Sequence, residues 1–206
     1  MKKLAIGCGV LLVLAIGVLI VIAIAGGSYN HLQKLSQGVN YQWSQVQNVY
    51  QRRADLVPNL VATVSGAANF EKSTLTEITE ARASVGQIKV DPKNAPTDAA
   101  KLAQFEQAQG ALSSALSRLL VVSERYPDLK ATDSFRDLQA QLEGTENRIS
   151  VERGRFNEAV QAYDTAIKSF PAVFYAGMCG FTEKPYFTAT TGADKPPQVQ
   201  FDFNKK

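Results

Sequence analysis

The chain has 206 residues with 22 Lys or Arg, 19 Asp or Glu and a net charge of +3. Lys2 and Lys3 precede a long apolar stretch, which leaves 20 basic and 19 acidic residues in the rest of the chain. A near-neutral body argues against nucleic acid as a partner, because nucleic-acid binding requires a basic face. Two distant cysteines, Cys8 and Cys179, exclude a disulfide-dense scaffold, and a single histidine, His31, excludes a His-rich metal site.

The stretch from Leu4 to Ala25 contains no charge and no proline. As a helix it would be roughly 33 Å long, enough to cross a hydrocarbon core of about 30 Å. We therefore expect residues 1–26 to be a membrane anchor in contact with the bilayer through residues 4–25. A cleaved signal peptide would have a shorter apolar run, although Ala23-Ile24-Ala25 resembles a cleavage site. A lipoprotein signal would place its apolar run before the cysteine, whereas most of this run follows Cys8.

The flanking charges predict the orientation of this anchor. Lys2, Lys3 and the amino terminus precede it, and Lys34 is the only Lys or Arg within about 20 residues after it. The positive-inside rule then predicts a cytoplasmic N-terminus and a periplasmic or extracytoplasmic body.

Beyond the anchor, apolar residues recur every three or four positions, which is typical of helices that bury one face. Four amphipathic helices are predicted, over residues 29–64, 73–85, 98–126 and 132–170. The first continues from the anchor through a loose joint at Gly26-Gly27 and bends at Pro58. Residues 86–97, with one Gly and two Pro, are expected to be a loop.

These elements predict an all-α protein, in which an N-terminal transmembrane helix is followed by an antiparallel up-down helical bundle of about four helices. The bundle would cover residues 27–181, and residues 182–206 would form an irregular tail with at most one short strand around Val199, Phe201 and Phe203. Because the last helix returns toward the membrane, the aromatic segment 171–181 would lie near the bilayer surface. Alternatively, this segment closes the open end of the bundle.

Three charged residues occupy positions on the apolar stripes. Arg53 belongs to the first helix, and Glu146 and Arg153 belong to the last. Counting helical rise from the far end of each helix places the three at one level of an antiparallel pair. A lone buried charge would cost several kcal/mol, so we expect a polar layer of paired charges. Its candidate members are Arg53, Glu146, Arg153, Asp55, Asn59 and Asn157.

This polar layer has two interpretations. It could fix the register between the two helices, as polar core residues do in coiled coils. It could also be an internal pocket that binds an ion or a small molecule.

Two stretches of the chain are distinctive. Residues 50–61 read Tyr-Gln-Arg-Arg-Ala-Asp-Leu-Val-Pro-Asn-Leu-Val, and residues 126–131 read Tyr-Pro-Asp-Leu-Lys-Ala. Together with the anchor and the stripe from Phe135 to Phe170-Pro171, they resemble the LemA family of bacterial membrane proteins, from the anchor to about Phe187. Phe156-Asn157 departs mildly from the Tyr-Asn that is frequent in that family.

The resemblance implies a helical extracytoplasmic domain on one membrane span. It brings no established enzymatic activity and no catalytic residues. Association with membrane-bound proteases or envelope stress proteins is suggested for relatives.

The sequence contains no His-Glu-x-x-His motif, phosphate-binding glycine loop or Cys-x-x-Cys pair. We therefore expect no enzymatic activity, no cofactor and no metal. The expected function is that of a membrane-anchored adaptor or scaffold of the bacterial cell envelope, which contacts an unknown envelope protein near the Pro92 and Pro127 loops, far from the bilayer. The alternatives are a module that senses a small molecule or ion through the polar layer, and a regulator of a membrane protease. Ala5 and Gly9 form a small-xxx-small step, so a homo-oligomer is also open.

The predicted orientation can be tested with a C-terminal reporter. Alkaline phosphatase, which is active only outside the cytoplasm, should be active when fused after Lys206, because the positive-inside rule places the body there. A reporter that is active only in the cytoplasm should stay silent at the same position. Activity of the second reporter would contradict the orientation.

Overall fold

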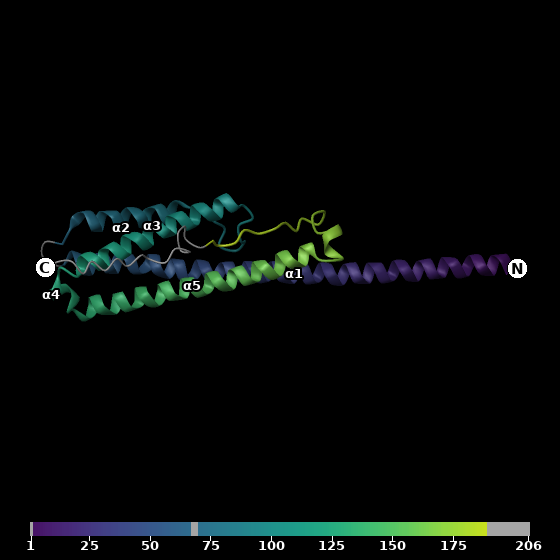
Figure 1. Cartoon of the computed structure of the whole chain (residues 1–206), viewed down its shortest axis with the longest axis horizontal. Coiled ribbons are helices and arrows are strands. Elements are labelled where there is room, and N and C mark those ends of the chain that lie inside the picture. The colour runs from purple at the N-terminus through teal and green to yellow at the C-terminus, as the bar shows by residue number, and fades with distance from the viewer. Residues whose placement is uncertain (1, 67–69, 189–206) are drawn as a thin grey trace, which may run out of the picture.

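The computed structural model describes residues 2–66 and 70–188, with side chains from residue 11 onward. The elements are α1 (Lys2–Ser65), α2 (Lys72–Gln87), α3 (Ala99–Ser123), α4 (Pro127–Lys130), α5 (Asp133–Lys168) and the 3₁₀ turn η1 (Ala172–Phe174) (Figure 1). The described residues form no strand, so the predicted all-α class is confirmed. Capping supports the helix starts, since Asp98 accepts a hydrogen bond from the Ala100 amide (2.8 Å) and Thr132 accepts one from the Phe135 amide (3.4 Å).

Helix α1 is a single element of 64 residues, about 96 Å long at 1.5 Å per residue. It continues through Gly26 and Gly27, so the predicted joint there is wrong. A helical glycine costs only about 1 kcal/mol relative to alanine, and propagation from helix already formed on both sides offsets that cost. Pro58 also lies inside the helix, with its side chain exposed.

The N-terminal part of α1 is a candidate membrane span. Its most apolar 18-residue window has a mean hydropathy of 2.7 and is not buried against any other described part of the chain. In Figure 1 this purple segment extends alone beyond the other helices. Such a long exposed apolar surface is unfavourable in water and suits a lipid environment.

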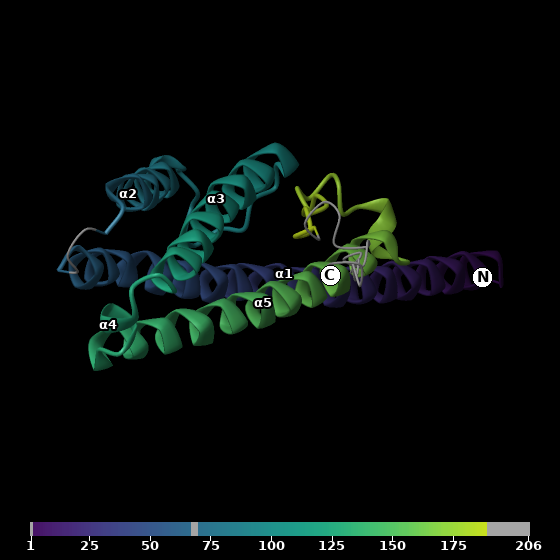
Figure 2. The same ribbon diagram turned by 60° about the vertical axis from the view of Figure 1, so that its left-hand side comes forward.

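Helices α1 and α5 lie side by side as an antiparallel pair (Figures 1 and 2). The Trp43 and Phe156 rings lie 5.7 Å apart, and the Arg53 guanidinium lies 2.8 Å from the Glu146 carboxylate. Ten positions separate Trp43 from Arg53 on α1, and ten separate Glu146 from Phe156 on α5. The pair therefore keeps one register over this length, and the two apolar stripes meet residue by residue.

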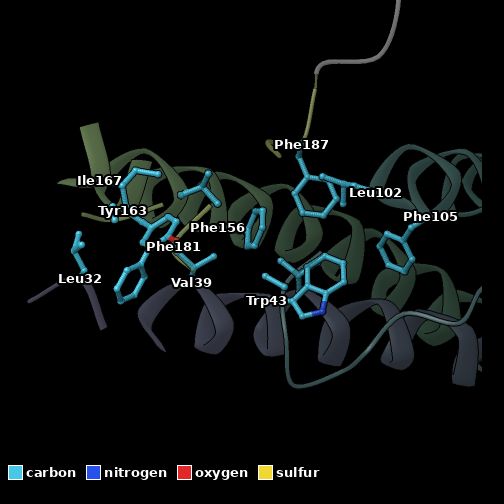
Figure 3. Close-up of a cluster of buried hydrophobic side chains, with 14 of the residues drawn as sticks. Leu32, Val39, Trp43, Leu102, Phe105, Phe156, Tyr163, Ile167, Phe181 and Phe187 are labelled. Atoms are coloured by element: carbon cyan, nitrogen blue, oxygen red, sulfur yellow. The ribbon is translucent and has the colours of Figure 1, made fainter. Parts of the chain in front are cut away.

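The core has two parts along this pair. The part nearer the candidate span is centred on Trp43, which is fully buried and packs against Phe105, Phe156 and Phe187 (Figure 3). The distal part contains Val57, Leu60, Leu119, Phe135 and Leu142, among others.

The short helices α2 and α3 depart from a regular up-down bundle. They pack against each other as a hairpin, and α3 crosses α1 at a clear angle in Figure 2. Their 16 and 25 residues are too few to cover the 36-residue α5 from end to end. The loop between them lies beside Trp43, whose indole Nε1 donates to the Asp91 carbonyl (2.8 Å). The expectation that the Pro92 loop lies at the distal end is therefore wrong.

The C-terminal segment covers the part of the pair that the hairpin leaves open. Residues 182–188 form neither helix nor strand, and Phe187 is buried against Trp43 and Phe156. The Asn157 amide group holds this segment through two hydrogen bonds of 2.9 Å with the backbone of Phe187. The expected short strand at Val199, Phe201 and Phe203 lies outside the described residues.

Candidate functional site

The candidate site is built around the buried Arg53, which is 1% exposed. Its Nη1 donates to Glu146 Oε1 of α5 at 2.8 Å and to Ser113 Oγ of α3 at 2.5 Å. Its Nη2 donates to the Gln109 backbone carbonyl at 3.0 Å and also to the Gln109 side-chain oxygen. One guanidinium therefore joins helices α1, α3 and α5.

Most of the Arg53 guanidinium group interacts with the side chains and backbone around it. Its Cζ lies 5.1 Å from the centroid of the Tyr50 ring, within the range of a cation–π interaction. Arg53 Nε, by contrast, is buried and finds no hydrogen-bond partner within the described parts of the chain. Since guanidinium has five N–H donors, one donor of this residue is left over.

Arg153 forms a second charged group on the same side of the molecule. Its Nη2 donates to Glu106 Oε1 of α3 at 2.5 Å and to the Thr188 carbonyl at 2.9 Å. Its Cζ lies 4.7 Å from the centroid of the Phe187 ring. Arg153 therefore ties α5 both to α3 and to the C-terminal segment.

The two Arg–Glu pairs line one cleft of about 560 Å³. Two positive and two negative side chains give it a balanced charge. Burial raises the pKa of Tyr50, against the opposing effect of the Arg153 and Arg53 charges, so its phenol stays neutral at physiological pH. The cleft is lined by Tyr50, Arg53, Glu106, Gln107, Gln109, Gly110, Ser113, Ser114, Glu146, Ile149, Arg153 and Thr188.

The structure brings Arg53 and Glu146 into contact and places Arg153 in the same cleft. Arg153 pairs with Glu106 and not with Glu146. The seven positions between Glu146 and Arg153 correspond to about 10 Å of helical rise, so one carboxylate does not serve both arginines. The arrangement is thus two pairs at successive levels and not a single three-residue layer.

The other three candidate residues do not join it. Asp55 is exposed and accepts a hydrogen bond from Gln51 of its own helix, and Asn59 is exposed. At about 100° per residue, Asp55 and Asn59 lie on faces of α1 that point away from Arg53. Asn157 binds the Phe187 backbone instead.

Helix α3 supplies the site residues that sequence reasoning missed, namely Glu106, Gln109 and Ser113. Gln109 offered a signal, since it is a polar residue at a buried position of the apolar stripe of α3. Glu106 and Ser113 lie next to that stripe and carry no such signal. No group of three or more His, Cys, Asp or Glu side chains in the described parts of the chain is placed to hold a metal ion.

The fold defines a class of protein, an all-α body on one candidate membrane span. Within this class the chain belongs to the LemA family, which it matches over residues 42–201. Two relatives from Paramagnetospirillum magneticum, magnetosome proteins MamQ 1 and MamQ 2, are each 25% identical over 186 residues, which cover 82% of this chain and 67% of theirs. Protein LemA of Metamycoplasma hominis is 26% identical over 144 residues, which cover 70% of this chain and 61% of its own.

The contribution of the Arg53–Glu146 pair can be measured with Glu146→Leu. We expect a loss of about 1–3 kcal/mol in the free energy of unfolding, because the buried guanidinium loses its charged partner while the carboxylate is only partly withdrawn from water. The measurement is denaturant unfolding of the full chain in detergent micelles, followed by the fluorescence of the single tryptophan, Trp43.

Glu143→Leu is the matched control. Glu143 is exposed one turn earlier on α5 and accepts a hydrogen bond from Gln139 of the same helix. It should change the free energy of unfolding by less than about 0.5 kcal/mol. Equal effects of the two substitutions would show that the pair contributes nothing specific.

Proposed function

We propose that this protein is a membrane-anchored scaffold or adaptor of the bacterial cell envelope, which presents its body to a partner protein on the periplasmic or extracytoplasmic side. The observation that carries the proposal is the continuity of α1. One helix is both the candidate membrane span and the central element of the body. A continuous helix of this kind suits a protein that positions its body relative to the membrane.

The length of α1 sets how far the body reaches. Forty residues separate Ala25 from Ser65, which corresponds to about 60 Å of helix beyond the apolar stretch. The antiparallel α5 runs along this part of α1 and buries its apolar stripe. The part of α1 beyond the apolar stretch is therefore supported over most of its length. The distal end of the body would therefore be held at a set height above the bilayer.

The distal end offers a surface for a partner. A pocket of about 670 Å³ lies there, between the end of α1 and the short helix α4. The Tyr126 ring packs against Phe70 at 4.9 Å, and an ion pair between Arg125 and Glu71 (2.7 Å) lies beside it. Aromatic residues and Arg are enriched at protein contact surfaces.

The names of the relatives fit this proposal. Two are named as magnetosome proteins, and another carries only the family name. Sequence relatives that carry different names are compatible with a scaffold whose partner differs between bacteria.

A second candidate function is the sensing of a small polar molecule or ion in the cleft between α1, α3 and α5. It is favoured by the balanced charges of the cleft and by the unpartnered donor of Arg53. Regulation of a membrane protease, the third candidate, is a particular form of the adaptor role and rests on the family resemblance.

Photocrosslinking in intact cells tests the scaffold. In one variant a photoreactive phenylalanine replaces the exposed Asp128 on α4. In a control variant the photoreactive phenylalanine replaces the exposed Tyr41 on α1. We expect a discrete protein adduct from position 128 and a much weaker one from position 41, because the partner would contact the distal end. The mass of the adduct distinguishes a second copy of this chain from another protein.

The opposite result would favour the sensor. The absence of any adduct at position 128, together with a ligand-dependent rise in the melting temperature that Arg53→Met abolishes, would contradict the scaffold.

A further inference from the structure

An exposed apolar surface follows the end of α5. We call it the apolar cap, and it consists of Phe170, Val173, Phe174 and Met178, which are 80%, 52%, 74% and 84% exposed. Four large apolar side chains gathered in one short segment are unusual on a surface that faces only water. The Phe170 and Phe174 rings contact each other at 6.1 Å, so the cap is a cluster and not scattered residues.

The opposite face of the same segment is packed against the body. Ala172, Ala176 and Phe181 are buried, and Ala172 accepts hydrogen bonds from the amides of Tyr175 and Ala176 at 3.0 and 2.8 Å. This face closes the end of the bundle, as one interpretation of the sequence predicts. Because one face of the segment is packed against the body, the cap on the opposite face points outward.

The cap lies at the height where α1 leaves its apolar stretch. Phe181 packs edge-on against Tyr29 of α1, with ring centroids 5.4 Å apart. Tyr29 is four positions after Ala25, which corresponds to about 6 Å of helix. In Figure 1 the yellow-green segment lies beside α1 where the purple part begins to extend alone.

This height matches the headgroup region of a bilayer. The polar layer on each side of the hydrocarbon core is roughly 5–8 Å thick, so a helix whose apolar stretch ends at Ala25 carries Tyr29 within or just above it. Trp and Tyr side chains such as that of Tyr29 are enriched at that depth. Phe, Leu and Trp side chains form the apolar face of helices that lie in the membrane interface.

The charges around the cap favour apolar insertion over electrostatic attraction. Lys168 pairs with Glu183 at 2.9 Å, and Lys184 is buried with its Nζ 5.7 Å from the centroid of the Tyr163 ring. Neither lysine forms an unpaired basic patch for anionic lipids. Contact with lipid would therefore depend on apolar area and little on salt.

We propose that the apolar cap is a second membrane contact, which inserts into the headgroup region of the same bilayer that α1 crosses. This inference rests on the anchoring that the proposed function assumes. A single helix leaves the body free to rotate about the helix axis, whereas a cap placed to one side of α1 fixes the face that the body turns toward the membrane. The cleft and the distal pocket are then presented in a set direction.

Quenching by spin-labelled lipid tests the proposal on the full chain. Cys8→Ala and Cys179→Ser give a background in which a single cysteine carries an environment-sensitive fluorophore. Its positions are 174 in the cap, 19 in the apolar stretch and 121, where Val121 is 71% exposed on α3 away from the cap. The protein is placed in vesicles of three parts phosphatidylcholine to one part phosphatidylglycerol, with the nitroxide either near the headgroup or near the end of the acyl chain.

We expect the probe at position 174 to be quenched most by the nitroxide near the headgroup, and the probe at position 19 by the nitroxide near the chain end. The probe at position 121 should be quenched by neither. The substitutions Phe170→Ser and Met178→Ser should weaken quenching at position 174 and leave quenching at position 19 unchanged, because they remove apolar area from the cap alone.

The outcomes separate the two claims. Quenching at position 19 with none at position 174 would overturn the cap contact and leave the anchor intact. No quenching at either position would overturn the anchor itself. A blue-shifted probe at position 174 without quenching would show that a protein, and not lipid, covers the cap.

Discussion

The pairing of α1 with α5 is the constraint on which the rest of the structure depends. Both helices carry apolar residues at three- and four-residue steps, and their antiparallel register is the same at Trp43–Phe156 and at Arg53–Glu146. Burial of these facing stripes supplies the main favourable free energy of the body, at about 25 cal/mol per Å² of apolar surface. The α2–α3 hairpin and the C-terminal segment both pack onto surfaces that this pair creates.

The buried Arg53 interrupts this apolar seam and fixes the register of α5 relative to α1. Arg53 contacts α3 and α5 through Gln109, Ser113 and Glu146. A shift of α5 by one turn would move Glu146 about 5 Å and leave the guanidinium without its charged partner. The pair therefore disfavours slipped registers even where its net contribution to stability is small, as polar residues do in coiled coils. The same groups line the cleft, so a register device and a binding surface would share their residues.

Much of this arrangement is predictable from the sequence. Periodicity alone identifies the stripes that contain Trp43, Val57 and Phe156, since a helix with a buried face imposes its period on the residues it buries. A charged residue on such a stripe must find a partner, which is why the stripes themselves predict that Arg53 and Glu146 lie together. Capping preference restricts the start of α3 to Thr97 or Asp98, and in the structure Asp98 is the capping residue.

What could not be predicted depends on relations between helices that periodicity does not encode. The position of α3 places Glu106, and not Glu146, beside Arg153. The crossing angle that sets this position depends on how the side chains of the two helices interlock. Gly26 and Gly27 indicated a joint from their intrinsic propensity, but propagation along a long helix overrides a cost of about 1 kcal/mol per glycine. For the segment after α5 the sequence left two interpretations open, a position near the bilayer surface and closure of the bundle. In the structure one face of this segment closes the bundle and the other face is exposed.

The central claim, that one unbroken helix joins the membrane span to the body, is tested most directly by a distance between two spin labels on α1. Leu19 and Tyr41 are both exposed and lie on either side of Gly26-Gly27, and the labels replace them in the full chain reconstituted in vesicles after removal of Cys8 and Cys179. Their 22-residue separation corresponds to about 33 Å in a continuous helix, so we expect one narrow distance distribution near that value. A broad distribution, or one centred at a clearly shorter distance, would show that the glycines form a joint and would contradict the account.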